Sequence, residues 1–224
     1  MIPWELLDSA SVPGAGGELR LYRRGDEYSI RVRGQGELMN SRMHGSEDAL
    51  AEITCARLAD VSSPRILIGG LGMGFTLAAA LQHAPADARI IVAELVPAIV
   101  QWNLGPLGAV SGYPLRDERV SVREGDVAAI MQVESDAYDA ILLDVDNGPE
   151  GFTRPENDWL YDVDGLAAAY RALRANGVLA VWSAGPAPDF IQRLNKIGFD
   201  VDEVRVRAHA GKGARHVIWF ARKI

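Results

Sequence analysis

The chain contains 224 residues, of which 48% are hydrophobic and 24% charged, and its net charge is −7. This balance is typical of a globular domain and argues against a general nucleic-acid binder, which needs a basic surface. One cysteine, Cys55, excludes an intrachain disulfide and a cysteine-rich metal site. The N-terminus lacks a basic, apolar leader, and no apolar run of about 18 residues occurs, so we expect a cytoplasmic protein.

Residues 1–44 are predicted to form a small β-appendage. Residues 1–16 contain two prolines and two glycines and are expected to be an irregular lead-in. In residues 18–33, apolar and polar side chains alternate on either side of a turn at Gly25-Asp26, which predicts a β-hairpin. Residues 37–40 are expected to add a third strand. Because the appendage is too small for its own core, we expect it to pack on the main domain or on another copy of the chain.

Residues 45–224 are predicted to form one domain in which strands and helices alternate. Ser46 is the expected N-cap of its first helix. The final two strands are expected to form a hairpin around Gly211-Lys212-Gly213, so that one of them runs antiparallel. The predicted strands occupy residues 65–69, 89–94, 119–123, 138–143, 178–183, 200–208 and 215–222. This order predicts an α/β fold with a doubly wound, mostly parallel sheet of seven strands and helices on both faces.

The most informative stretch begins with the first of these strands. Ile66-Leu67-Ile68 favours a β-strand and leads into a cluster of glycines at Gly69, Gly70, Gly72 and Gly74. Glycines at this turn would let a ligand approach the backbone at the N-terminus of the next helix. Glu94 ends the following strand, 24 residues after Gly70, which is roughly the spacing at which a carboxylate meets the two hydroxyls of a ribose. The stretch therefore predicts a nucleoside-binding βαβ unit.

Two more acidic residues, Asp126 and Asp144, follow the next two strands. A single acid after a strand is often only a helix cap. In a doubly wound sheet, however, ligands bind at the carboxyl ends of the strands, and four candidate features fall at this edge in consecutive βα units. Their coincidence favours a binding site.

The segments at these strand ends resemble the spermidine synthase, or polyamine aminopropyltransferase, family. The matching segments keep the order and spacing of the family over residues 18–222. They are Ser46-Glu47, Ile66-Leu67-Ile68-Gly69-Gly70, Ala93-Glu94, Glu124-Gly125-Asp126, Tyr138–Asp144, Gly148-Pro149 and Trp159-Leu160-Tyr161. The resemblance implies the Rossmann-like fold of S-adenosylmethionine-dependent methyltransferases and a homodimer. It also implies a transferase of polyamine biosynthesis, which moves an aminopropyl group from decarboxylated S-adenosylmethionine to an amine and releases methylthioadenosine.

The resemblance also implies roles for individual residues. Glu94 would bind the ribose hydroxyls and Asp126 the adenine amino group, while Asp144 would hold the attacking amine and help to remove its proton. This last role is chemically reasonable, because an amine attacks only when deprotonated and a carboxylate can orient it and accept its proton. Candidates for the wall of the substrate pocket are His44, Glu47, Trp159 and Tyr161. No metal is expected.

The sequence departs from the family at three positions. Gly72 stands where the family has an aspartate that holds the amine of the donor, Asn147 stands where it has a second acid, and Gly45 stands where it usually has a tyrosine. Asp146 is a candidate replacement for the second acid, because alternation in an extended segment would place it on the same face as Asp144. Alternatively, Asp146 belongs to a simple turn and faces solvent.

Three functions therefore remain open. The first is an aminopropyltransferase with an unusual donor or acceptor site. The second is a methyltransferase that uses intact S-adenosylmethionine, because Gly70-Leu71-Gly72-Met73-Gly74 also fits the GxGxG pattern of methyltransferases and lacks an aspartate that would oppose the carboxylate of the donor. The third is a nucleoside-binding protein that has lost turnover. The predicted partner is a small cationic amine, with neither nucleic acid nor membrane.

Overall fold

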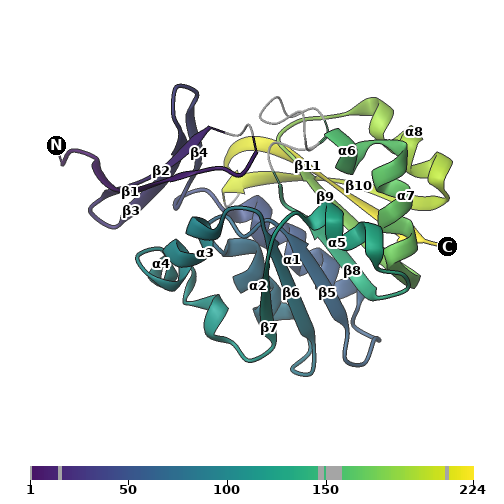
Figure 1. Cartoon of the computed structure of the whole chain (residues 1–224). Helices are drawn as coiled ribbons and strands as arrows, with labels where there is room; N and C mark the ends of the chain where they lie inside the picture. The colour runs from purple at the N-terminus through teal and green to yellow at the C-terminus, as the bar shows by residue number, and fades with distance from the viewer. Residues whose placement is uncertain (1, 15–16, 146–148, 150–157, 210–211) are drawn as a thin grey trace.

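The computed structural model describes residues 2–14, 17–145, 149, 158–209 and 212–224 (Figure 1). Their strands form two sheets, a four-stranded N-terminal sheet in the order β1-β2-β3-β4 and a seven-stranded sheet in the order β10-β11-β9-β8-β5-β6-β7. No helix in these ranges is long and apolar enough to cross a bilayer. The predicted α/β class with an antiparallel N-terminal appendage is confirmed.

The N-terminal sheet is larger than the sequence predicts. It consists of β1 (Glu5–Ser11), β2 (Glu18–Arg24), β3 (Glu27–Val32) and β4 (Gly36–Asn40), all antiparallel. The prediction of an irregular lead-in over residues 1–16 was wrong, because β1 belongs to this segment. Most β1 side chains are exposed, so the strand carries no clear alternation and is ordered by its backbone pairing with β2.

The seven-stranded sheet is doubly wound as predicted. Strand β5 lies between β6 and β8, with β7 beyond β6 and β9 beyond β8, all in parallel pairs, whereas β11 pairs antiparallel with both β9 and β10. The strands are β5 (Arg65–Gly69), β6 (Arg89–Glu94), β7 (Val120–Glu124), β8 (Tyr138–Leu143), β9 (Leu173–Ser183), β10 (Phe199–His209) and β11 (Lys212–Lys223). The helices are α1 (Gly45–Arg57), α2 (Phe75–His83), α3 (Pro97–Leu104), α4 (Gly108–Ser111), α5 (Val127–Val133), α6 (Asp158–Tyr161), α7 (Val163–Ala172) and α8 (Pro188–Ile197), with a 3₁₀ turn at Pro114–Arg116.

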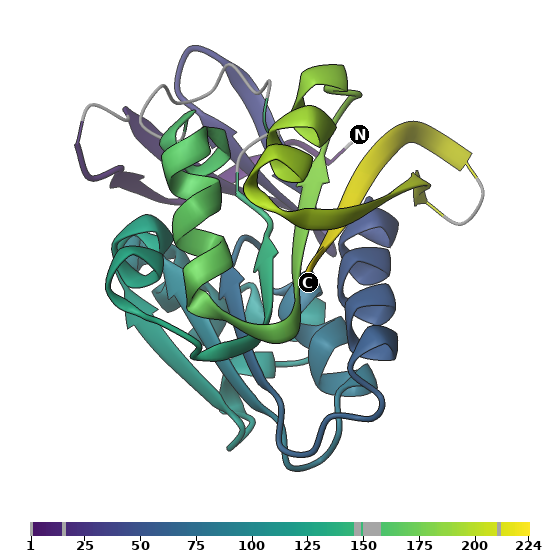
Figure 2. The same cartoon turned by 90° about the vertical axis from the view of Figure 1, so that its right-hand side faces the viewer.

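Helices cover both faces of this sheet (Figure 2). Successive side chains of a strand point to opposite faces, so Ile66 and Ile68 of β5 join a core with α1, α2 and α3, whereas Leu67 joins a second core with α5, α7 and α8. The central strands are apolar throughout because both of their faces are covered.

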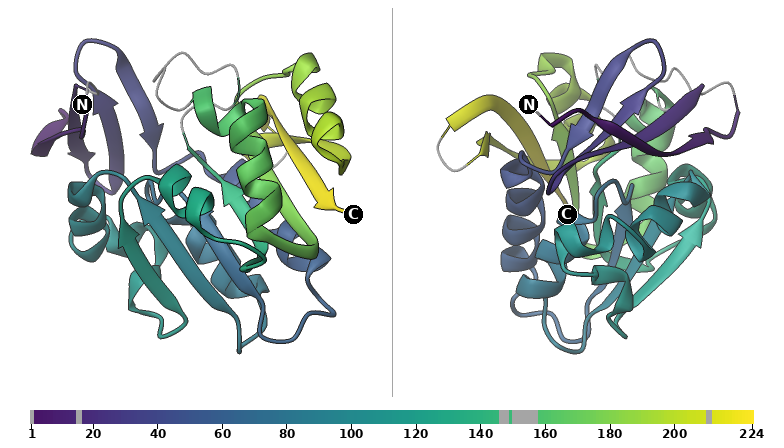
Figure 3. Two further views of the ribbon diagram at one scale, coloured as in Figure 1. Left: turned by 45° about the vertical axis from the view of Figure 1, so that its right-hand side comes forward. Right: turned by 90° about the vertical axis from the view of Figure 1, so that its left-hand side faces the viewer.

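The N-terminal sheet packs against the main domain at the end where the parallel strands finish (Figure 3). Its buried residues Leu21 and Ile30 belong to the same core as α1 and α2. The indole Nε1 of Trp102 on α3 donates a 2.7 Å hydrogen bond to Asp8 Oδ2 on β1. The sheet is thus fastened over the carboxyl ends of the strands. The division of the chain into domains 1–44 and 45–224 stays a prediction.

Candidate functional site

Two adjoining cavities lie at the carboxyl ends of β5, β6, β7 and β8. This is where a doubly wound sheet binds ligands, because the chain leaves β5 in one direction and β8 in the other. The larger cavity has a volume of about 150 Å³ and the smaller about 90 Å³. Leu38, Met39, Gly72 and Asp144 line both, so a ligand that spans the two cavities would pass these four residues.

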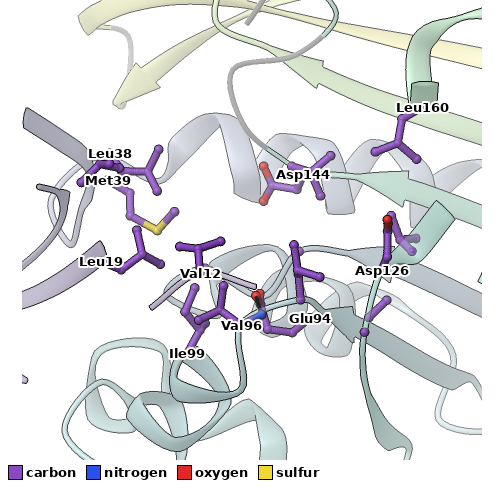
Figure 4. A pocket seen from close by; sticks show the side chains of 18 of the residues that line it. Val12, Leu19, Leu38, Met39, Glu94, Val96, Ile99, Asp126, Asp144 and Leu160 are labelled. Carbon is purple, nitrogen blue, oxygen red and sulfur yellow. Dashed lines mark hydrogen bonds between the residues drawn. The ribbon is translucent and has the colours of Figure 1, made fainter. Parts of the chain in front are cut away.

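The larger cavity lies between the strand ends and the N-terminal sheet. Leu19, Leu38 and Met39 face it from that sheet, opposite Asp126 and Asp144 (Figure 4). Its wall consists of Val12, Leu19, Val32, Gln35, Leu38, Met39, Gly70, Gly72, Ala93, Glu94, Leu95, Val96, Ile99, Gly125, Asp126, Val127, Asp144, Val145 and Leu160. Most of these side chains are apolar, so the carboxylates stand out as the groups that can orient a ligand.

The predicted glycine turn forms part of this wall. Gly70 has φ +90°, and a Cβ at this position would collide with the backbone oxygen of Asp144, so the close approach of the two strand ends requires glycine. Gly72 has φ +51°, and a Cβ there would lie 3.2 Å from Met39 Sδ. The side-chain amide of Asn103 donates a 2.9 Å hydrogen bond to the carbonyl of Gly72 and holds the turn from behind.

Glu94 is only 5% exposed but still borders the larger cavity. Its Oε2 accepts a 2.8 Å hydrogen bond from the backbone N–H of Leu71, and its Oε1 accepts one of 2.8 Å from Val96. Burial raises the pKa of Glu94, and the backbone N–H groups of Val96, Leu71, Gly72 and Leu95 oppose that shift. Because Glu94 borders the larger cavity, its carboxylate can also accept from the hydroxyls of a ligand there.

Asp126 can both cap a helix and bind a ligand. Its Oδ1 accepts a 2.8 Å hydrogen bond from the backbone N–H of Ala128 and so caps α5. The residue is exposed and also borders the larger cavity, which leaves Oδ2 available to an amino group of a ligand. The two interpretations that the sequence allows for Asp126, a helix cap or a ligand-binding residue, are therefore compatible.

Asp144 follows β8 and faces both cavities. Its Oδ2 accepts a 2.6 Å hydrogen bond from the hydroxyl of Thr76, which lies in the first turn of α2. Burial raises the pKa of Asp144, while the Thr76 hydrogen bond opposes that change. The backbone N–H of Asp144 donates to the carbonyl of Gly69, which joins the ends of β8 and β5.

The smaller cavity brings Glu47 of α1 toward Asp144. Burial, followed by repulsion from Asp144, raises the pKa of Glu47 to about 7. The wall of this cavity consists of Leu38, Met39, Asn40, Glu47, Leu71, Gly72, Met73, Phe75, Thr76, Asp144 and Trp182. Two neighbouring carboxylates and two aromatic rings in one wall provide a suitable surface for a cation.

Ser46 does not cap α1 as predicted. The residue at the N-cap is His44, and the Ser46 side chain points instead toward the interior, where its Oγ donates a 2.6 Å hydrogen bond to Glu47 Oε2. His216 Nδ1 on β11 lies 2.9 Å from the same Oγ. Ser46 is fully buried, so its hydroxyl bonds side chains rather than the exposed amides of a helix end.

The remaining predicted residues lie next to the cavities rather than in the walls described above. The ring of His44 stacks on that of Phe75, with centroids 4.2 Å apart, and His44 Nδ1 lies 2.7 Å from Asp48 Oδ2. Trp159 packs against the second core. Tyr161 is buried, and its hydroxyl donates a 3.1 Å hydrogen bond to the carbonyl of Val145, so it supports the backbone that follows Asp144.

The outer glycines of the turn also stay outside the walls. A Cβ on Gly69 would crowd Val127 and Leu143, and one on Gly74 would crowd Ser111 and Asn103. Asp146 and Asn147 lie outside the described residues, so Asp146 as a second acid stays a prediction. The described residues contain no group of three or more histidine, cysteine, aspartate and glutamate side chains that could hold a metal.

Sequence reasoning missed several residues of the cavities. Leu38 and Met39 were assigned only to a possible strand, and Trp182 was not a candidate, yet all three line the smaller cavity. Thr76 and Ser46 offered a weak signal, because a hydroxyl beside a predicted acid can hydrogen-bond it. His216 had no such signal, since its partner Ser46 lies 170 residues away.

Comparison with solved structures shows which proteins share this architecture. Spermidine synthase from Thermotoga maritima matches with a TM-score of 0.76 and 18% identity over 98% of this chain and 73% of its own. A spermidine synthase in complex with the transition-state analogue AdoDATO matches with a TM-score of 0.79 and 18% identity over 98% and 74%. A probable spermidine synthase from Corynebacterium glutamicum matches with a TM-score of 0.66 and 16% identity over 98% and 80%. The predicted resemblance to spermidine synthases is confirmed at the level of the fold.

Sequence comparison adds little to this result. No protein-family model matches the chain. An uncharacterized protein of Methanocaldococcus jannaschii is 22% identical over 198 residues, which cover 79% of this chain and 52% of that protein. The chain thus spans about half the length of the curated relative it matches.

Proposed function

We propose that the protein transfers an aminopropyl group from decarboxylated S-adenosylmethionine to a small amine and releases methylthioadenosine. The observation that carries this proposal is the charge of the two cavities. Their charged lining residues are Glu47, Glu94, Asp126 and Asp144, and the described parts of the walls contain no lysine, arginine or histidine. Such a site favours a cationic donor and a cationic acceptor, and it disfavours a ligand that carries a free carboxylate.

The larger cavity suits the nucleoside half of the donor. Glu94 borders this cavity and can accept from ribose hydroxyls, and Asp126 can accept from an exocyclic amino group. Apolar residues of the N-terminal sheet cover the opposite side, where they exclude water from a thioether or sulfonium. The fit therefore supports an adenosine derivative whose sulfur lies near Met39 and Gly72.

Asp144 would orient the acceptor, because it lines both cavities and a ligand in the smaller one would approach the donor beside it. Bound decarboxylated S-adenosylmethionine would supply a carbon activated by the adjacent sulfonium. The amine nitrogen must first lose a proton, after which its lone pair forms the new nitrogen–carbon bond as the carbon–sulfur bond breaks. Asp144 and Glu47 would hold the ammonium, accept its proton and keep the nitrogen directed toward the larger cavity.

Gly72 distinguishes this site from the family pattern. No carboxylate occupies this position, and Met39 covers it with an apolar thioether instead. A carboxylate that could then serve the aminopropyl arm is Asp144, which lines the same two cavities as Gly72. We infer that Asp144 serves the donor arm as well as the acceptor.

A titration with four ligands tests the proposal. Calorimetry would compare decarboxylated S-adenosylmethionine, the intact compound, methylthioadenosine and adenosine, and a second assay would measure methylthioadenosine release with a series of diamines. We expect the decarboxylated donor to bind more tightly than the intact one, and release to depend on the amine. Tighter binding of intact S-adenosylmethionine would instead indicate a methyltransferase, and nucleoside binding without a product from any amine would indicate a protein without turnover.

A further inference from the structure

We propose that Met39 is a specificity-determining residue, whose apolar side chain makes the site reject a donor that ends in a carboxylate. The inference rests on the proposed function and deepens it, because it names the side chain that selects decarboxylated over intact S-adenosylmethionine. It depends on a β-bulge in β4, on the direction of the backbone donors in the glycine turn and on the position of Asp144.

A β-bulge in β4 directs two consecutive apolar side chains at the site. Ile30 on β3 pairs with Met39, whereas the next residue, Arg31, pairs with Glu37, so Leu38 is an extra residue in β4. In a regular strand, Leu38 and Met39 would point to opposite faces of the sheet. A bulge changes the direction of a side chain, and here both residues line both cavities (Figure 4).

Met39 covers the part of the glycine turn that the arm of a donor would pass. A Cβ on Gly72 would lie 3.2 Å from Met39 Sδ and 3.4 Å from its Cε. Both residues line the two cavities, as does Asp144. A donor with its nucleoside in the larger cavity and its arm directed at the smaller one therefore passes between a thioether and a carboxylate.

The backbone donors of the glycine turn are directed at acceptors of the protein. The N–H of Gly70 donates to the carbonyl of Ala93 at 2.9 Å, and the N–H of Leu71 donates to Glu94 Oε2 at 2.8 Å. The N–H of Gly72 also stabilises the ionised form of Glu94. Successive backbone N–H groups bind an anion only when they point at it, so these three do not form an anion site in the cavity.

Polar side chains in the wall of the smaller cavity do not replace these donors. The amide of Asn40 donates to Glu37 Oε1 at 2.8 Å, and the hydroxyl of Thr76 donates to Asp144 Oδ2 at 2.6 Å. The indole nitrogen of Trp182 is buried beneath the wall. The described parts of both walls also contain no lysine, arginine or histidine, so an anionic arm would meet no cation there.

These contacts act against the intact donor in two ways. Its carboxylate lies on the same carbon as its amine, so an amine held by Asp144 brings the carboxylate toward that like charge. On the other side the carboxylate would meet the apolar side chains of Leu38 and Met39. Moving a carboxylate out of water without a hydrogen-bond partner is strongly unfavourable. Decarboxylation removes both penalties and leaves an ammonium that Asp144 attracts, so the site selects by exclusion.

Two substitutions that give Met39 a hydrogen-bond donor test this role. Met39→Gln keeps the length of the side chain and adds an amide that can donate to a carboxylate. Calorimetry on the full chain would give the Kd of the decarboxylated and the intact donor. We expect the wild type to prefer the decarboxylated donor, and this preference to fall about 10-fold in Met39→Gln, because the intact donor gains a charged hydrogen bond. Met39→Thr adds a hydroxyl in a residue that strands favour and should shift the preference in the same direction.

Met39→Leu is the matched control, because it keeps an apolar cover without a donor. Its preference between the two donors should stay that of the wild type. Methylthioadenosine, which lacks the arm, verifies that each variant folds and binds the nucleoside. A preference that stays at the wild-type value in Met39→Gln and Met39→Thr, or that falls equally in Met39→Leu, would overturn the role of Met39.

A separate assay distinguishes failure of this inference from failure of the proposed function. Methylthioadenosine release with 1,4-diaminobutane measures transfer without reference to the donor preference. A wild type that selects the decarboxylated donor, loses this selection in Met39→Gln and releases no methylthioadenosine would overturn the proposed function but support donor selection by Met39. A wild type that prefers the intact donor would overturn both.

Discussion

The two cavities hold their carboxylates in different ways. Glu94 in the larger cavity is held at both oxygens by backbone N–H groups of Leu71 and Val96. Glu47 and Asp144 in the smaller cavity are held by the hydroxyls of Ser46 and Thr76, and they face each other. Backbone N–H groups oppose the rise that burial causes in the pKa of Glu94, whereas repulsion from Asp144 adds to burial and raises the pKa of Glu47 to about 7. The first arrangement suits binding, and the second suits proton transfer.

The carboxylates of the two cavities also differ in which parts of the chain bring them to their partners. The partners of Glu94 come from the turns on either side of it within one βαβ unit, which also contains β5, α2 and β6. Glu47 lies in α1 and Asp144 follows β8. They come together only because α1 packs on the sheet that contains β8. A change at Glu94 should therefore leave the pairing of Glu47 with Asp144 largely intact.

The largest expected effect is on catalysis in the smaller cavity. Asp144→Asn keeps the shape of the side chain and its contact with Thr76 but removes the charge that holds and deprotonates the amine. We expect aminopropyl transfer to fall by about 10²- to 10⁴-fold while methylthioadenosine binding changes little. Methylthioadenosine release and calorimetry measure the two properties, and Asp189→Asn in the exposed first turn of α8 is the control. Unchanged transfer would remove Asp144 from its assigned role.

A smaller effect is expected on binding in the larger cavity. In Glu94→Gln, the amide nitrogen would face one of two N–H donors that now meet carboxylate oxygens. Loss of a charged hydrogen bond costs about 1.5–3 kcal/mol, so methylthioadenosine affinity should fall roughly 10- to 150-fold and the Tm should decrease. Calorimetry and thermal unfolding measure both, with Glu52→Gln at an exposed position of α1 as the control. Equal affinities in these two variants would contradict a role for Glu94 in nucleoside binding.

The smallest expected effect is on the choice of donor, and it comes from Gly72, which lines both cavities. Gly72→Asp introduces an acid that the family carries and this chain lacks. The φ of +51° is tolerated by aspartate better than by most residues, and the nearest obstacle is the flexible end of Met39. We expect the preference for decarboxylated over intact S-adenosylmethionine to rise about 10-fold. Calorimetry with both donors measures it, and Gly72→Asn provides the same shape without the charge. An equal preference in both variants would show that the added charge does not reach the donor.

Local patterns were sufficient for much of the prediction. The apolar run before Gly69, the acids after three strands and the turn at residues 211–213 predicted the sheet, its final hairpin and the edge at which the two cavities lie. The N-terminal sheet was less predictable, because the exposed side chains of β1 carry no clear alternation and its order depends on pairing with β2. Ser46 was assigned to the wrong partner, since a serine before a helical pattern predicts an N-cap and its actual bonds reach Glu47 and His216.

The amino-acid sequence by itself determined the doubly wound architecture and the positions of Glu94, Asp126 and Asp144, because strand period, glycine turns and strand ends are local properties of the chain. Only the tertiary structure decided that Glu47 faces Asp144, that Met39 covers Gly72 and that His216 reaches Ser46. Each of these contacts joins elements distant in sequence. Their geometry depends on how α1, the N-terminal sheet and β11 pack around one core, and no local pattern records that packing.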